Sequence, residues 1–410
     1  MKKIILFILI SNYAWANPHV PLDLTFEESK AWYERLQKDH QKIKYEPFVK
    51  ESIDGGEKMS QWIKLINDNR DPSNAIRLTS KQTQRKIPVE QPSIYGPSTI
   101  DTRYNDLINT IPTYMKNIIY GAEQITSSLK IADEEFIRWA QKVSALYQTA
   151  VRWTGMKPWL SQMAQRRVRD VRGYYYLKNL KDLDYQLENI EIFTTDEINK
   201  TILALEQICI NTEGLEDDCD KAVDKAYQTK SLKKFKDKYW NNAIRNWNVF
   251  FKIFSPRKDI VWKESAPGVM NVVFKDPKNP IIANWLKENV EDEFQLQNKN
   301  WGLELTFIKG RLGKRTAYLE FQPNVTPHVT GGNVIVMDSN TPLEEYNVKW
   351  TIRHEFGHIL SLPDCYHEFY VKEKNVMINY QLDTTDLMCS RAGQMNDRIY
   401  EELKKAYLKK

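Results

Sequence analysis

Apolar residues recur at helical spacing through much of the first 256 residues. Between residues 136 and 147 they stand three or four positions apart, which places them on one face of a helix. Thr194 stands three residues before Glu197, an arrangement that favours the start of a helix. The pattern predicts a helical region over residues 17–256, with a proline-containing loop between about 70 and 100.

The pattern changes after residue 256. A helix is expected over 280–290, another runs from about residue 343 into a histidine-containing segment, and a last one covers 395–409. Runs of β-branched and aromatic residues predict strands at 271–274, 303–308, 317–321 and 333–337. This order predicts an α+β fold, with a mixed sheet backed by helices.

The strand at 333–337 allows two interpretations. It follows Gly331 and Gly332, and an edge strand at this place could pair with a substrate peptide through main-chain hydrogen bonds. Its almost unbroken apolar run is also typical of a central strand that is covered on both sides. The sequence leaves both open.

The first 16 residues resemble a secretory signal. Lys2 and Lys3 precede an apolar run over 4–10, and Ala14-Trp15-Ala16 is a small-x-small cleavage site. We therefore expect a signal peptide over 1–16, a helical N-terminal domain over 17–256 and a second domain over 257–410. The protein would be secreted or periplasmic, without stable membrane insertion after cleavage; the alternative is a short anchor that stays attached.

Composition excludes few functions. Of the 410 residues, 41% are hydrophobic and 12% aromatic, which indicates a globular protein rather than a disordered one. A net charge of +5 does not call for a nucleic-acid partner, and we expect none.

The histidine-containing segment has the spacing of a zinc site. His354 and His358 in H-E-x-x-H lie four positions apart on a predicted helix, so both rings can face one ion. Glu355 lies beside that ion without binding it, which suits a carboxylate that takes a proton from a zinc-activated water.

A catalytic zinc needs a third protein ligand. Asp364 follows His358 by six residues, after a break at Ser361 and Pro363 that lets the chain turn back toward the ion. His367 and Glu368 are alternative third ligands with poorer spacing. His328 lies before the strand at 333–337, where it is either near the cleft or, as is usual for a lone histidine, a surface or structural residue.

This segment resembles the metzincin zinc endopeptidases. Their motif, H-E-x-x-H-x-x-Gly-x-x-His or Asp, is followed by a methionine turn, which Met388 matches here. Aspartate as third ligand, with Tyr366 two residues later, is similar to the small secreted proteases called snapalysins. The resemblance covers residues 258–410. The chain departs from the family at Ser361, where the family has a glycine that permits a positive φ.

The resemblance implies a metzincin-like catalytic domain, with a mixed sheet, an active-site helix and a small C-terminal lobe. Met388 would lie beneath the metal, and Tyr366 would donate a hydrogen bond to the oxyanion formed during attack. The expected activity is a secreted zinc-dependent endopeptidase, with polypeptide as substrate, zinc-activated water and Glu355 as general base.

Four cysteines allow three pairings, and export favours their oxidation. The local pairing, Cys209–Cys219 with Cys365–Cys389, is the natural one. Its second bridge would tie the loop of the third ligand to the methionine turn, and closing that loop stabilises by roughly 3 kcal/mol in the chain-entropy model.

The sequence leaves the role of the helical half and the choice between functions open. The helical half is either a removable pro-domain or an attached accessory domain, and a block of zinc by Cys209 or Cys219 is a minor alternative. Two other functions compete with the endopeptidase: a non-catalytic binding protein that keeps the metzincin fold, and a zinc hydrolase of cell-wall peptide amides.

Overall fold

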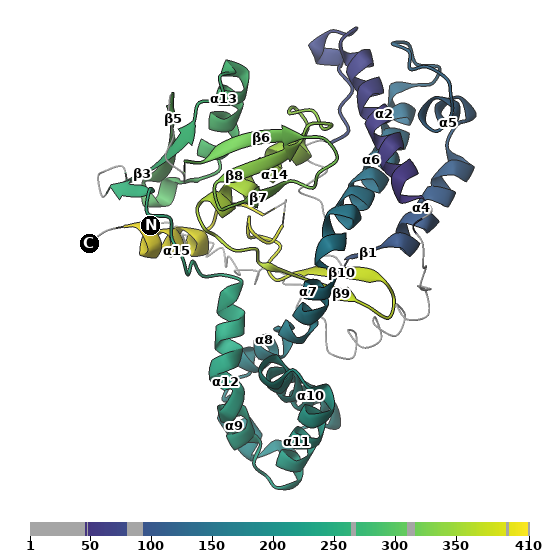
Figure 1. Cartoon of the computed structure of the whole chain (residues 1–410). Coiled ribbons are helices and arrows are strands. Elements are labelled where there is room, and N and C mark those ends of the chain that lie inside the picture. Colours follow the sequence, from purple (N-terminus) through teal and green to yellow (C-terminus); the bar gives the residue numbers. More distant parts are fainter. Residues whose placement is uncertain are drawn as a thin grey trace, which may run out of the picture.

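The computed structural model describes residues 46, 48–79, 93–263, 268–309, 316–390 and 393–408. The expected signal peptide lies outside them. The fold is α+β, as the sequence predicts, and its apolar side chains gather in three buried clusters. Two clusters belong to the helical half and the third to the strand-rich half (Figure 1). Among the described residues, no helix is both long and apolar enough to cross a membrane.

The first cluster lies among helices from the start of the chain. Trp62 and Phe136 are fully buried there, with ring centroids 5.1 Å apart. Met377, from the far end of the sequence, belongs to the same cluster, so the helical unit and the C-terminal region share a core. The helices are α2 (Val49–Asn67), α4 (Pro97–Thr110), α5 (Thr113–Ile119), α6 (Asp133–Met156) and α7 (Leu160–Gln165).

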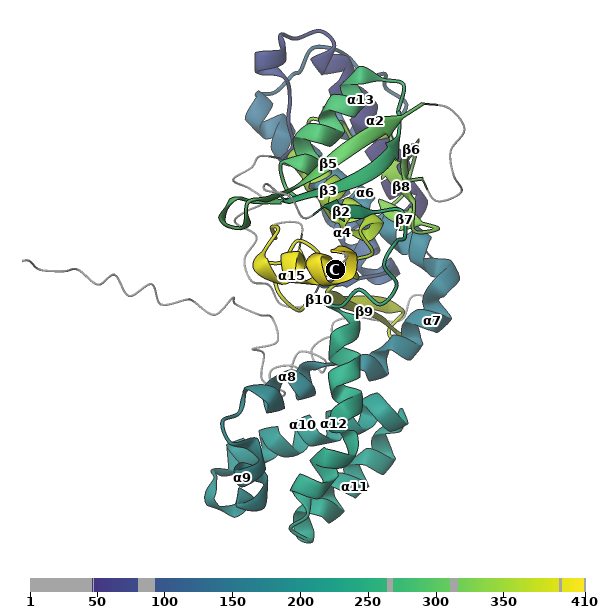
Figure 2. The ribbon, with the colours of Figure 1, turned by 90° about the vertical axis from the view of Figure 1, so that its left-hand side faces the viewer.

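The second cluster forms a separate helical lobe, which extends away from the sheets in both views (Figures 1 and 2). The Cys209–Cys219 disulfide joins two of its helices, α10 and α11. Thr194 caps α10 and accepts a hydrogen bond from the Glu197 amide, as its spacing predicts. The lobe contains α8 (Arg172–Asn179), α9 (Leu183–Glu188), α10 (Thr195–Glu213), α11 (Glu216–Gln228) and α12 (Leu232–Val249).

The strand-rich half contains two sheets that meet at one point. The first has the order β2-β3-β5-β4 and the second β6-β8-β7. A bridge between Phe274 and Ala317 connects β3 to the segment that leads into β6. The strands are β2 (Val261–Lys263), β3 (Gly268–Lys275), β4 (Gln295–Leu296), β5 (Trp301–Ile308), β6 (Tyr318–Gln322), β7 (His328–Thr330) and β8 (Val334–Asp338), and the helices are α13 (Pro280–Leu286), α14 (Tyr346–Ile359) and α15 (Asp397–Tyr407).

The structure decides between the two interpretations of the strand at 333–337. β8 is paired on both sides, parallel to β6 and antiparallel to β7. All five of its residues are buried, which explains the unbroken apolar run. The edges of this sheet are β6 and β7, and β7 is a short element that the sequence analysis did not predict.

A hairpin that the sequence analysis did not predict follows Pro363. β9 (Tyr366–Val371) and β10 (Val376–Gln381) pair in antiparallel register. The outer edge of β10 pairs with β1 (Ser93–Tyr95), which lies in the region predicted as an open loop. This three-stranded sheet therefore contains one strand from the helical half and two from the C-terminal region.

Candidate metal centre

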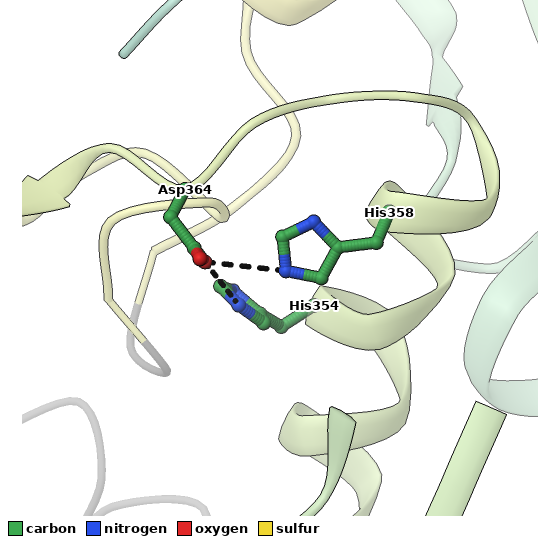
Figure 3. A group of neighbouring side chains, drawn as sticks. All are labelled: His354, His358 and Asp364. Carbon is green, nitrogen blue, oxygen red and sulfur yellow. Dashed lines mark hydrogen bonds and ion pairs between the residues drawn. The ribbon is translucent and has the colours of Figure 1, made fainter. Parts of the chain in front are cut away.

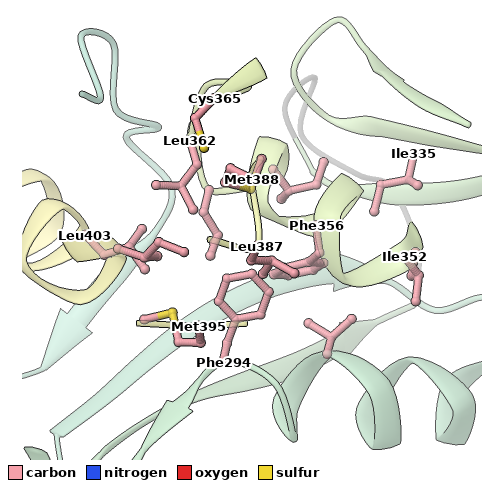
Figure 4. Packing of buried hydrophobic residues seen from close by; sticks show 14 of the residues in the cluster. Phe294, Ile335, Ile352, Phe356, Leu362, Cys365, Leu387, Met388, Met395 and Leu403 are labelled. Atoms are coloured by element: carbon pink, nitrogen blue, oxygen red, sulfur yellow. The ribbon is translucent and has the colours of Figure 1, made fainter. Parts of the chain in front are cut away.

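One helix, α14, carries both histidines of the motif. Its opposite face is apolar, and Phe356 is fully buried with its ring 5.8 Å from that of Phe294 (Figure 4). Because residues four apart share a helix face, this packing turns His354 and His358 together away from the core. The two rings lie 4.9 Å apart, centroid to centroid.

The turn after α14 forms although it lacks the family's glycine. Ser361 has φ +64°, a left-handed conformation that serine adopts less easily than glycine. The amide of Ser361 donates to the His358 carbonyl at 2.9 Å, and the amide of Leu362 to the Gly357 carbonyl at 3.0 Å. These two hydrogen bonds form a Schellman motif at the C-terminus of the helix, which turns the chain back toward α14.

The reversal brings Asp364 to the two histidines (Figure 3). Its Oδ1 lies 3.1 Å from Nε2 of His354 and 3.2 Å from Nε2 of His358. One donor atom from each of the three residues lies within 4.8 Å of the other two. The three ligands expected from the sequence thus converge on one point.

Backbone carbonyls fix the orientation of both imidazoles. Nδ1 of His354 lies 3.0 Å from the Leu387 carbonyl, and Nδ1 of His358 lies 2.9 Å from the Leu362 carbonyl. A carbonyl only accepts, so each Nδ1 carries a proton whether the ring is neutral or charged. In the neutral ring that binds a cation, the lone pair of each Nε2 faces the centre, as in many metal sites.

The three residues perturb one another electrostatically. Burial alone raises the pKa of Asp364, but the His358 imidazole and hydrogen bonds from both rings bring it well below its usual range. Burial alone lowers the pKa of His358, and the adjacent Asp364 carboxylate raises it to about 9. Without a cation, the pair therefore favours a charged imidazolium beside a carboxylate.

The donor set fits zinc. Two imidazole nitrogens and one carboxylate oxygen form a typical catalytic ligand set, which leaves a fourth position open. Tetrahedral bonds of about 2.0–2.2 Å separate neighbouring ligand atoms by roughly 3.4 Å. The observed contacts of 3.1 and 3.2 Å are close to that separation. A cation bound by the three residues would also take the place of the proton that otherwise keeps His358 charged beside Asp364.

Met388 lies directly against the motif helix. It is fully buried, and a Cβ on Gly357 would overlap its Sδ and lie 3.0 Å from its Cε. The Cys365–Cys389 disulfide joins the residues that follow Asp364 and Met388, and the Cys365 amide donates to the Met388 carbonyl at 3.1 Å. Both disulfides therefore follow the local pairing.

Asp386 holds this turn, and the sequence analysis missed it. Its carboxylate is fully buried and accepts hydrogen bonds from the Met388 amide at 2.9 Å and from Nε of Arg398 at 2.7 Å. An acidic residue two positions before the methionine was visible in the sequence. Its basic partner, twelve residues further on in α15, was not predictable without the fold.

Glu355 and Tyr366 both lie at the centre. Glu355 is 6% exposed and lines the same cavity as the three candidate ligands. The Tyr366 ring lies 6.3 Å from that of His354, nearly parallel to it. Burial raises the pKa of Tyr366 well above its ordinary value, which keeps its hydroxyl protonated and able to donate.

The alternative ligands point elsewhere or bind other groups. His367 is buried among aromatic rings, 5.1 Å from Phe369 and 5.2 Å from Tyr380. Glu368 is paired with Arg152 of α6 at 2.7 Å. Asp364 is therefore the residue that the structure brings to the two histidines. His328 lines the cavity from β7, as its position before the strand at 333–337 suggests.

A cavity of about 870 Å³ opens over this centre. Its floor contains the three candidate ligands, Glu355 and Tyr366. One side is formed by residues 324–329, which lead into β7, and the other by residues 151–166 of α6 and α7. The helical half thus contributes directly to the walls of the cleft.

No match to this chain is found among models of known protein families, curated proteins or solved structures, so its function is interpreted from the site itself.

Proposed function

We propose that this protein is a zinc-dependent endopeptidase. The observation that carries the proposal is the convergence of His354, His358 and Asp364, with Glu355 beside them, at the floor of an open cavity. Two oriented imidazoles and a carboxylate supply three ligands, and the cavity leaves room for water and substrate.

A zinc ion bound there would polarise a substrate carbonyl and make a bound water more acidic. Glu355, next to the ligand His354, is suited to take a proton from the attacking water and pass it to the leaving amine. The Tyr366 hydroxyl is suited to donate a hydrogen bond to the substrate oxygen that gains negative charge during attack. Met388 supports the histidines from below through its contact with Gly357.

A metzincin-type catalytic domain of the snapalysin-like kind accounts best for these elements. Support comes from the aspartate as third donor, the buried methionine beneath the motif and the mixed sheet behind α14. Ser361 reaches the left-handed conformation that the family's glycine would provide. The two disulfides are compatible with an exported protein, and we propose a secreted or periplasmic location.

Polypeptide is the substrate class that suits the cleft. β7 is an edge strand of its sheet, with β8 as its partner, and its residues His328 and Val329 line the cavity. An extended peptide can pair with such an edge through main-chain hydrogen bonds. Edge pairing of this kind would favour cleavage within an extended chain.

The test combines metal content with hydrolysis. Purified protein is expected to contain one zinc per chain and to cleave an unfolded protein until a chelator removes the metal; added zinc should restore cleavage. His358→Phe should abolish zinc binding, whereas the same change at His328, also in the cavity, should leave the zinc content intact. Zinc without any hydrolysis of polypeptide or of cell-wall peptide amides would favour a non-catalytic binding protein.

A further inference from the structure

The cleft wall from the helical half is one face of a continuous helical segment. α6 passes through a single 3₁₀ turn (Lys157–Trp159) into α7 and a second turn (Arg166–Arg169), so the chain stays helical from residue 133 to 169. Cavity-lining residues recur along it every three or four positions, and span about 21 Å at 1.5 Å per residue. They include Arg152, Gly155, Met156, Trp159, Met163 and Arg166.

The centre of this face is apolar. Trp159 is 52% exposed, although it is one of the largest apolar side chains in the protein. Met156 and Met163 line the cavity beside it, and both also pack into or against the first helical core. An exposed tryptophan beside two methionines, inside a cavity rather than on a convex surface, is typical of a binding surface.

Gly155 leaves space in front of this surface. It is the penultimate residue of α6, inside the segment that stays helical to residue 169, and a Cβ built on it meets no atom within 4 Å. Glycine is less favourable than alanine in a helix. The open volume lies on the side of the wall that lines the cavity. A peptide can therefore approach the helix backbone closely at this point.

The wall is held in place before any ligand arrives. Arg152 pairs with Glu368 of β9, and the Trp153 ring lies 6.4 Å from that of Tyr370 on the same strand. A preformed surface loses less conformational entropy on binding than one that must be ordered first. Across the cavity, the edge strand β7 offers main-chain groups to the same ligand.

We propose that Trp159 and Met156 form a subsite for an apolar side chain of an extended polypeptide that binds between β7 and the α6–α7 wall. This assignment rests on the proposed function, because it takes polypeptide as the substrate class. The occupant is a large aliphatic or aromatic side chain, since the surface is apolar and the adjoining position at Gly155 is open.

A binding experiment tests the subsite separately from catalysis. Zinc-loaded protein carrying Glu355→Gln is titrated into two labelled unstructured peptides, one with a single phenylalanine and one with alanine in its place. Fluorescence anisotropy is expected to show at least fivefold tighter binding of the phenylalanine peptide. Trp159→Ala should abolish that preference, Trp159→Phe should retain most of it, and Tyr185→Ala, which removes a 57% exposed aromatic residue in the separate lobe, should not change it.

Equal affinity for both peptides, no binding of either, or a preference that survives Trp159→Ala would overturn the proposal. The outcome is distinct from failure of the proposed function. A protein that cleaves polypeptide but shows no preference dependent on Trp159 retains the function and loses the subsite. A protein that shows the preference but never hydrolyses a peptide loses the function and retains the subsite.

Discussion

Nη2 of Arg152 lies 2.7 Å from Oε1 of Glu368. The first residue belongs to α6, and the second to β9, only four positions after the candidate ligand Asp364. The hydroxyl of Tyr95 in β1 donates to the same oxygen at 2.7 Å. This ion pair therefore joins the helical half to the strand that leaves the candidate metal centre.

Loss of one partner of this pair should destabilise the protein strongly. Glu368 is 4% exposed and Arg152 27% exposed, so either charge would be left largely buried without its counter-ion. We expect Arg152→Met to lower the free energy of unfolding by about 2–4 kcal/mol, and the double variant with Glu368→Met to recover part of this loss. Urea unfolding of both single variants and the double variant measures the coupling.

The exposed ion pair Lys50–Asp54 provides a matched control. Its side chains are 82% and 53% exposed, so water screens the pair and Lys50→Ala should leave the free energy of unfolding almost unchanged. Equal, small effects at Arg152 and Lys50 would show that the buried pair does not hold the two halves together.

The C-terminal region should not fold without the helical half. A fragment of residues 257–410 would lose β1, which pairs with the outer edge of β10. It would also leave two buried carboxylates without their hydrogen-bond donors. These are Glu345, which accepts from the amides of Leu78 and Thr79, and Glu368. We expect a fragment with no cooperative thermal transition and no stoichiometric zinc, unlike a chain of residues 46–410. A fragment that folds and binds zinc would instead identify the helical half as a removable pro-domain.

Two glycines near the C-terminal ends of their helices should respond to alanine in opposite directions. At Gly357 the new Cβ would overlap Met388, so Gly357→Ala should destabilise by about 1–3 kcal/mol and weaken zinc binding. At Gly155 nothing lies within 4 Å, and alanine should stabilise by about 0.5–1 kcal/mol. Thermal unfolding and zinc titration of both variants measure the difference. Equal effects would argue against close packing of the methionine beneath the motif.

His367 should make the protein sensitive to acid without binding zinc. Burial lowers the pKa of His367 to about 4, despite the nearby Asp170 carboxylate, from about 6.5 in the unfolded chain. Between these values the unfolded chain takes up a proton that the folded chain does not, so stability falls as the pH drops. One pKa unit is worth about 1.4 kcal/mol, and the loss between pH 6.5 and pH 5 is roughly 2 kcal/mol.

The variant His367→Phe removes this proton-binding group and keeps an aromatic ring beside Phe369 and Tyr380. Urea unfolding of the metal-free protein at pH 7.5 and pH 5 should show a smaller loss in the variant than in the original chain. The variant should retain one zinc per chain. Loss of zinc would make His367 a ligand, and an unchanged pH dependence would refute the argument from burial.

The sequence predicted those parts of the fold that depend on local pattern. Runs of β-branched and aromatic residues located β3, β5, β6 and β8, and the four-residue spacing of His354 and His358 located the candidate metal centre. Ser361 adopts the turn in spite of its side chain, whose Oγ accepts a hydrogen bond from the Tyr407 hydroxyl at 3.3 Å. That partner lies 46 residues away, so the compensation was not predictable from the motif.

Contacts between distant segments were missed for the same reason. The sequence analysis did not single out Arg152, because nothing in its neighbourhood indicates Glu368 as its partner. The β9–β10 hairpin did leave a local signal: Asn375, with φ +55°, ends a lysine-containing turn between two runs that are rich in aromatic and β-branched residues. Its inward-facing polar residues, His367 and Glu368, concealed the pattern, since their surroundings come from other parts of the chain.

Glu355 is the residue on which the proposed peptide hydrolysis depends. The measurement is the rate of cleavage of an unfolded protein by the zinc-loaded chain and by Glu355→Gln, with the zinc content of both determined in the same preparations. We predict one zinc per chain in each protein. The cleavage rate of the variant should fall at least a thousandfold, because it lacks the Glu355 carboxylate that moves the proton. Undiminished hydrolysis by a zinc-loaded Glu355→Gln protein would contradict it.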